Sequence, residues 1–364
     1  MTRFVLFLLV LAALSASAQA QSTGAKAQAA DTTAAKPDAD WLLLPFASYS
    51  PDTKLAGGVV GGYYQSAQGG RPGSSVQSTI TVTQRRQVIV QATPELYLNG
   101  GQWRVQGDLQ AAHFPNSFYG IGGDTPASAE EAYTARYVLI DAAAQRRLRP
   151  HLRVGPRLYV RTGTVMDPDS GGLIAQERVP GADGGLTAGL GGTVFWDARN
   201  SLYYPTAGTY ADLGATLYSA AWGSEYTFAH LKADARGYQG VGWGLLAGQV
   251  YAEGVLGDAP FELLPLLGGP DRMRGYREGR FRDNAYWTAQ VEYRAPLFWR
   301  FKATAFASVG AVGPRVGAAL VDDVEAAVGF GGRLRFTDDG VHGRVDLAYS
   351  RTGPELYLSL GEAF

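Results

Sequence analysis

The sequence contains no cysteine, no apolar run of membrane-helix length and no excess of charge of either sign. The absence of cysteine among 364 residues excludes a disulfide framework and any metal site built on thiolates. Lysine and arginine number 32 against 33 aspartate and glutamate, and this balance argues against a nucleic-acid partner. Since a spanning helix needs about 20 apolar residues, the mature chain is either soluble or crosses a membrane as strands.

The first 40 residues have the pattern of an export signal followed by a tail. Arg3 precedes an apolar run over residues 4–14, and Ala18 and Ala20 have the A-x-A spacing of a cleavage site. Residues 1–20 are therefore predicted to be a secretory signal peptide cut after Ala20, with Ala18 as the alternative. Residues 21–40 have almost nothing to bury and predict a flexible tail, so the folded domain is expected at 41–364.

From Trp41 onward, apolar and polar residues alternate with a period of two between clusters of Gly, Pro, Asn and Asp. In residues 284–296, one face carries Trp287, Ala289, Val291 and Tyr293, and the other carries Thr288, Gln290, Glu292 and Arg294. The chain has 48 glycines, and its mean hydropathy is −0.09. This pattern predicts an all-β fold: a transmembrane antiparallel barrel whose strands show one face to lipid and the other to water.

Turn residues divide the domain into about sixteen candidate strands. They lie near 41–49, 55–66, 75–84, 87–98, 102–113, 131–147, 150–164, 185–198, 206–220, 224–237, 243–257, 284–296, 300–311, 322–336, 341–350 and 354–364. An even number returns both ends to the periplasm. The long connections 114–130, 165–184 and 258–283 all follow odd-numbered strands, which predicts that they face outward; 66–74 is the longest exception.

The connection 258–283 concentrates five arginines among glycines: Arg272, Arg274, Arg277, Arg280 and Arg282. If this loop stood in solvent, it could bind anionic lipid head groups. If it folded back into the lumen, the arginines could pair with inward-facing acids. The candidate luminal partners are Glu292, Glu325 and Asp346.

The segment Gly-Pro-Asp-Arg-Met-Arg-Gly-Tyr at 269–276 resembles the loop-six signature of the Omp85 superfamily, the BamA/TamA and surface-antigen D15 type of barrel. Segments 49–53, 118–122, 196–200, 292–296 and 329–333 resemble family segments in the same order, so the resemblance spans 41–364. It implies a sixteen-stranded barrel with a long loop in the lumen, where the wall holds the loop-six motif Arg274, Gly275 and Tyr276.

Two departures from the family pattern limit what the resemblance implies. The family strand after loop six usually has a Phe-x-Asp-x-Gly pattern, and here Ser308 replaces the aspartate. Glu292, Glu325 or Asp346 must then supply the acidic partner of Arg274. The family's periplasmic POTRA modules have no room before Trp41, so a barrel-only member is expected, and client capture by such modules is not carried over.

The first and last predicted strands contain residues that weaken pairing. Pro45 removes a ladder donor, and Gly361 provides no side chain to pack. These residues are either ordinary variation at strand ends or part of a weak seam that can part toward lipid. Phe364 resembles the aromatic end of outer-membrane assembly signals, although Glu362 is a poor match two positions earlier.

Other motifs are weak. Asp167, Asp169 and Gly171 form a D-x-D-x-G fragment that lacks the distal glutamate of a calcium loop, so a turn is favoured. The glycines at 189–192 precede no helix and are expected on a strand rather than at a phosphate. The four histidines are scattered and no G-x-S-x-G elbow is present. We therefore predict no enzyme activity, catalytic residue, metal or cofactor.

The predicted function is that of an integral outer-membrane barrel that translocates or inserts protein or lipid through a lateral seam gated by loop six. The alternative is a passive diffusion pore or a structural barrel. The expected partners are outer-membrane lipid, a protein or lipid client and a separate periplasmic protein.

Overall fold

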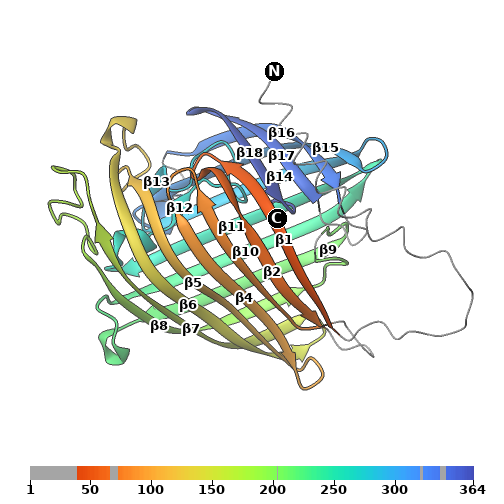
Figure 1. The fold of residues 1–364 in the computed structure, drawn as a ribbon, viewed down its shortest axis with the longest axis horizontal. Coiled ribbons are helices and arrows are strands. Elements are labelled where there is room, and N and C mark those ends of the chain that lie inside the picture. Colours follow the sequence, from red (N-terminus) through yellow and green to blue (C-terminus); the bar gives the residue numbers. More distant parts are fainter. Residues whose placement is uncertain (1–38, 66–72, 203, 320–322, 337–341) are drawn as a thin grey trace, which may run out of the picture. The chain divides into compact units, whose positions relative to one another are not determined.

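The structure, a computed structural model, describes residues 39–65, 73–202, 204–319, 323–336 and 342–364. These residues form a closed antiparallel barrel of sixteen strands (Figure 1). Neighbouring strands follow chain order, except that β14 pairs with β11 because β12 and β13 form a separate ribbon. The predicted signal peptide and residues 21–38 of the predicted tail lie outside the described residues.

The barrel strands of the first half are β1 (Ala39–Ser50), β2 (Lys54–Gln65), β3 (Ser75–Thr83), β4 (Val88–Leu98), β5 (Trp103–Phe118), β6 (Glu131–Arg149), β7 (Leu152–Met166) and β8 (Gly184–Asp197). Those of the second half are β9 (Gly208–Tyr218), β10 (Phe228–Val241), β11 (Gly244–Gly257), β14 (Ala285–Pro296), β15 (Phe301–Gly313), β16 (Glu325–Arg335), β17 (His342–Ser350) and β18 (Gly353–Leu360). The helical turns are Ala127–Ala129, Ala220–Trp222, Phe261–Leu263 and α2 (Val316–Ala319). No helix in the described ranges is long and apolar enough to cross a membrane.

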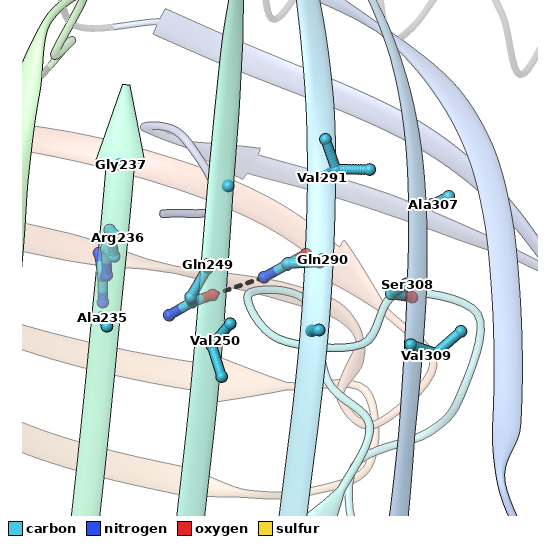
Figure 2. Close-up of a pocket in the computed structure, with 12 residues that line it drawn as sticks. Ala235, Arg236, Gly237, Gln249, Val250, Gln290, Val291, Ala307, Ser308 and Val309 are labelled. Atoms are coloured by element: carbon cyan, nitrogen blue, oxygen red, sulfur yellow. Dashed lines mark hydrogen bonds between the residues drawn. The ribbon is translucent and has the colours of Figure 1, made fainter. Parts of the chain in front are cut away.

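The wall shows the predicted alternation of side chains (Figure 2). On β14, Val291 is 43% exposed, whereas Gln290 and Glu292 on either side of it are 5% and 0% exposed. Gln290 donates a hydrogen bond to Gln249 of β11 (2.6 Å) on the luminal side. Small residues on β10, β11, β14 and β15 leave a recess of about 600 Å³ in this part of the wall. The period of two is therefore confirmed here as one lipid face and one luminal face.

Two predicted strands in the interior of the chain have wrong bounds. The strand predicted at 102–113 continues to Phe118, because Pro115 is tolerated where β4 has ended and only β6 still pairs with β5. The strand predicted at 224–237 runs from Phe228 to Val241, because Gly237 and Gly240 lie in the ladder and the turn comes at Gly242. In both cases a residue typical of turns occupies a strand.

Five of the six tryptophans that are at least 36% exposed in the described residues lie at one end of the barrel, and Trp222 lies at the other. Trp41, Trp103, Trp196, Trp243 and Trp299 all lie at or beside the strand ends opposite the long loops. Three of them are more than half exposed, at 82%, 66% and 78% for Trp41, Trp243 and Trp299. Tryptophan is enriched at the interface between membrane and water. This belt therefore marks the periplasmic boundary of the spanning region.

The long loops gather at the other end. An apolar cluster there joins the ends of β5 and β6 with residues from the loops 167–183 and 258–284; its members are Phe118, Tyr133, Ala135, Ile174, Val179 and Phe261. The Phe261 ring packs edge-on against Phe118 and Tyr133, with ring centres 5.2 Å apart in each case. The loops thus form a packed cap over this end of the barrel.

Candidate functional site in the barrel lumen

The connection between β11 and β14, residues 258–284, is named loop six here and folds as a hairpin inside the barrel. Its two arms pair through β12 (Leu266–Leu267) and β13 (Phe281–Arg282). Nearer the tip, the Gly269 N–H donates to the Tyr276 carbonyl at 3.0 Å. Residues 271–275 form the tip, which contacts the luminal faces of β14–β18. Of the two interpretations of this arginine-rich loop, folding into the lumen is the one observed.

Arg274 is the centre of this contact. Its side chain is fully buried, and its two terminal nitrogens form ion pairs with Glu292 of β14 and Asp346 of β17, each at 2.7 Å. The guanidinium also lies 3.5 Å from the centre of the Phe306 ring on β15. A guanidinium can hold two carboxylates and stack on an aromatic face at once, which an ammonium cannot do in the same geometry.

The two carboxylates are shared with wall arginines. Arg333 of β16 pairs with Asp346 (2.6 Å) and Glu292 (3.3 Å), and also with Glu362 (2.8 Å). Arg294 of β14 pairs with Glu292 at 2.7 Å. All of these side chains are 3% exposed or less. The luminal cluster therefore joins loop six, three wall strands and the segment after β18 in one network.

A fourth arginine completes the charge balance of the luminal cluster. Arg344 of β17 donates to the carboxylate of Asp271 in loop six at 2.9 Å. Arg274, Arg294, Arg333 and Arg344 thus face Glu292, Asp346, Glu362 and Asp271. The Asp271 side chain is 64% exposed, whereas the other seven side chains are buried. Because buried charges are costly unless paired, removing any one of those seven leaves a charge uncompensated.

Gly275 and Tyr276 fix the tip of loop six against β16–β18. Gly275 has a φ of +109°, and a Cβ there would lie 3.0 Å from the Ala327 Cβ. Its N–H donates to the Tyr357 hydroxyl (2.9 Å), and the Ser350 hydroxyl donates to its carbonyl (2.6 Å). Both the backbone angle and the close approach therefore require glycine. The Tyr276 ring is fully buried in the luminal apolar cluster with Met273.

Glu325 does not contact Arg274. It accepts a hydrogen bond from the Tyr276 hydroxyl and pairs with Arg351 in the turn after β17. The acidic contacts of Arg274 come from Glu292 and Asp346 alone among the three candidates. Glu325 therefore supports the neighbouring residue of the motif rather than its arginine.

The other four loop-six arginines do not make the contacts that were expected: none of them pairs with Glu292, Glu325 or Asp346. Arg272 lies 3.9 Å from the centre of the Tyr251 ring, and Arg282 donates to the Phe261 carbonyl (3.2 Å). Arg280 donates to the Thr125 carbonyl (2.7 Å). Arg277 reaches Glu130 (3.2 Å) in the loop after β5 and Asp52 (3.6 Å) in the turn after β1.

Asp52 ties loop six to the turn between β1 and β2. Its carboxylate accepts a hydrogen bond from the Glu278 N–H at 2.9 Å. Burial raises the pKa of Asp52 to about 7, and the nearby Glu278 carboxylate adds to the shift. Asp52 lies outside the spanning strands, at the end of β1 where the seam begins.

This raised pKa predicts that the barrel loses stability as pH rises. The folded state holds the Asp52 proton more tightly than the unfolded chain, so the contribution is complete below about pH 4 and lost as pH rises through about 7. Between about pH 5 and pH 8, the free energy of unfolding in detergent should fall by roughly 2–3 kcal/mol more in the wild type than in Asp52→Asn. An identical pH dependence of the two denaturation midpoints would contradict this assignment.

The seam between β1 and β18 is thinly paired. β1 pairs with β2 along its whole length, from Ala39 with Gln65 to Ser50 with Lys54. Within the described residues of β1 and β18, the one paired position is Tyr49 with Leu358. Pro45, predicted to weaken this seam, lies inside β1 opposite Val59 of β2, on the periplasmic side of that single pair.

The predicted last strand, 354–364, is wrong at its end. β18 stops at Leu360, and Gly361 has a φ of +82°, which turns the chain away from the wall. Gly361 therefore lies beyond the strand. Phe364 is 4% exposed and packs inside the barrel with Tyr238 and Leu245, and its carbonyl accepts a hydrogen bond from Arg294 at 3.1 Å.

The weaker motifs have structural explanations. The Asp169 carboxylate accepts a hydrogen bond from the Ala132 N–H (2.7 Å), and its carbonyl accepts one from Gly172 (3.1 Å), as in a turn. Gly189 lies on β8, where its luminal side is covered by the Tyr218 ring. The turn and the strand glycine agree with the expectations from the sequence.

Several residues of the luminal cluster were missed by sequence reasoning. Arg294, Arg333 and Glu362 form ion pairs within the network, and Tyr357 accepts a hydrogen bond from the Gly275 N–H. Arg294 lies at an inward position of a strand whose alternation the sequence shows, two residues from Glu292, so an arginine beside a luminal acid was a usable signal there. Nothing local indicates that Glu362 turns into the lumen.

A sixteen-stranded antiparallel barrel with a lipid-facing apolar surface and a hairpin held in its lumen defines a class of integral outer-membrane proteins of bacteria. The Omp85 superfamily domain matches residues 72–354, and the chain belongs to that superfamily. No curated protein sequence matches the chain.

Solved structures show the same fold. BamA from Haemophilus ducreyi lacking POTRA domains 1–3 is 14% identical with a TM-score of 0.62, over 90% of this chain and 70% of that one. CdiB from Escherichia coli is 12% identical with a TM-score of 0.57, over 90% and 63% of the two chains. CdiB from Acinetobacter baumannii is 10% identical with a TM-score of 0.56, over 89% and 59%. The chain thus spans less than two thirds of either CdiB.

Proposed function

We propose that this protein translocates or inserts a protein or lipid client through the seam between β1 and β18, and that loop six gates the seam. The observation that carries the proposal is the single paired position between these strands, Tyr49 with Leu358. Every other junction of the barrel is paired over eight or more positions in register. In lipid, backbone N–H and C=O groups must be paired within the barrel wall. Among the described strands, the β1–β18 junction is the place where opening the wall breaks the fewest backbone hydrogen bonds between strands.

An open seam has a clear physical use. Backbone N–H and C=O groups on a parted strand edge have no water partners in the hydrocarbon region, so they pair readily with an incoming strand. The same gap gives an amphiphile a path between lumen and bilayer. Membership of the Omp85 superfamily and the fold shared with BamA and CdiB support a general role in moving or inserting macromolecules, rather than in catalysis.

The luminal cluster supports coupling between loop six and the seam. Arg274 of loop six and Arg333 of the wall share Glu292 and Asp346, and Arg333 also holds Glu362. Glu362 lies two residues beyond the end of β18. A displacement of Arg274 would therefore change the electrostatic environment that keeps the segment 361–364 inside the barrel.

A passive pore is the second candidate, and one observation favours it. The luminal face of β5–β10 has a polar cavity of about 160 Å³ whose lining includes Asp108, Asp141, Arg157, Asp212 and Lys232. Such a surface would hold water and conduct small ions if both ends were open. The packed cap of loops at the outer end and the tip of loop six in the lumen weigh against steady conductance.

The test of the proposed function is the composition of outer membranes from cells lacking the chain. If it translocates or inserts a client, specific barrel proteins or surface lipids should fall in the deletion strain and return with the wild-type gene. Unchanged composition together with a change in small-solute permeability would favour the pore instead. Co-purification of a soluble periplasmic protein from the complemented strain would identify the expected periplasmic partner.

A further inference from the structure

Between Trp41 and Phe46, β1 is apolar on both of its faces. No residue from Trp41 to Ser50 carries a charge. The pairing of Tyr49 with Leu358 on the lipid side places odd-numbered residues of β1 outward, so Leu42, Leu44 and Phe46 face the lumen. Leu42 and Leu44 are each 41% exposed there. Leucine exposed toward a barrel interior departs from the rule that the luminal face is polar.

The neighbouring strand continues this surface. On β2 the luminal positions opposite Leu44 and Phe46 are Val60 and Gly58. The ring of Phe46 lies over Gly58, where a Cβ would come within 2.9 Å of it. Beyond β2 the character changes, because the luminal positions of β3 opposite Val60 and Gly58 are Thr79 and Thr81. The apolar luminal surface is therefore confined to β1 and β2, on one side of the seam.

This surface is continuous with the bilayer. On the periplasmic side of Tyr49, no described strand pairs with β1 at the seam, because the C-terminal segment turns into the lumen at Gly361. Trp41, 82% exposed in the periplasmic tryptophan belt, sets the depth of the membrane interface. Leu42, Leu44 and Phe46 follow it directly, at the depth of the hydrocarbon chains of the periplasmic leaflet.

We propose that the luminal surface formed by Leu42, Leu44, Phe46 and Val60 binds acyl chains of membrane lipids that enter beside β1. This inference rests on the proposed function in using the same seam, and it names lipid as the occupant. A polypeptide strand would pair with the backbone edge of β1, whereas this surface is a face made of side chains. An acyl chain has no hydrogen-bonding groups to satisfy, so it matches a charge-free face without leaving polar groups unpaired.

The absence of cysteine makes a spin-label experiment direct. Leu44→Cys and Val60→Cys, each carrying a nitroxide, are compared in phosphatidylethanolamine nanodiscs with two references. Leu43→Cys is the lipid-facing reference, and Gln106→Cys, in the polar luminal cavity, is the water-facing one. Relaxation by oxygen reports lipid, and relaxation by a polar nickel chelate reports water. Folding of each variant is checked by its heat-modifiable gel mobility.

We expect oxygen to relax the labels at positions 44 and 60 more than nickel does, as at position 43. At position 106, nickel should relax the label more than oxygen does. Val60 lies one strand farther from the seam, so its label reports the luminal surface rather than the outer bilayer. Nickel relaxation at both positions equal to that at 106 would overturn the proposal. Because the purified protein contains no client, this result is independent of transport. If nickel relaxes both labels but the protein is active and its activity depends on the seam, the luminal surface does not bind lipid, and the proposed function is still supported.

Discussion

Arg274→Ala is expected to abolish restoration of the outer-membrane composition while leaving the barrel assembled. The change removes the cation that two fully buried carboxylates, Glu292 and Asp346, contact at 2.7 Å. Breaking a buried ion pair from one side costs about 3–5 kcal/mol. If that energy holds loop six in place, its docking equilibrium constant falls by about two orders of magnitude or more. The strand ladder does not include Arg274, so the sixteen strands should still form.

Two variants serve as controls for this prediction. Arg280→Ala removes an equal charge from the same loop, but Arg280 binds the Thr125 carbonyl and contacts neither carboxylate. It should retain activity near the wild-type level. Arg274→Lys keeps the charge but loses the two-pronged contact and should be intermediate. Full activity of Arg274→Ala, at normal abundance in the membrane, would remove loop six from the mechanism.

The sequence was sufficient for the fold because the barrel depends on local alternation. The faces of β14 follow from residues 287–294 alone, and the loop lengths determine which ends of the strands face outward. Predicted strand ends failed where turn-forming residues occur inside a ladder. Gly237 of β10 and Pro115 of β5 are paired, because a neighbouring strand continues past them. Pairing across strands overrides the local preference of such residues.

For the site, the sequence indicated Arg274, Gly275 and Tyr276 with Glu292 and Asp346, and the structure brings these five together. Their part in gating stays a prediction. The sequence could not indicate that Gly361 turns the chain inward. Glycine permits this turn, but the contacts that hold it are Arg333 with Glu362 and Arg294 with the Phe364 carbonyl. Those contacts span 29 and 70 positions of the chain, so no local pattern records them.

A disulfide across the seam is expected to stop the activity reversibly. Tyr49 and Leu358 are the directly paired residues of β1 and β18, and opposite residues of antiparallel strands lie about 4.5–5.5 Å apart at Cα. This separation is within the range that a disulfide spans. Since the wild type has no cysteine, Tyr49→Cys with Leu358→Cys introduces a single crosslink. Oxidation then locks the one paired position that must separate for the seam to open.

A matched crosslink separates the seam from general rigidity. Tyr49→Cys combined with Leu55→Cys joins β1 to β2 at another directly opposite pair on the same face. It uses the same residue of β1 and adds the same covalent bond to the wall, but leaves the seam free. Oxidised protein carrying this crosslink should remain active, because β1 and β2 are expected to stay paired throughout the cycle.

The most direct test of a lateral seam is therefore the outer-membrane composition of the deletion strain complemented with each crosslinked variant, measured oxidised and after reduction. We expect the 49–358 crosslink to fail to restore composition when oxidised and to restore it when reduced, while the 49–55 crosslink restores it in both states. Normal restoration by a fully oxidised 49–358 crosslink would show that the client does not pass between β1 and β18, and would exclude a lateral seam at this junction.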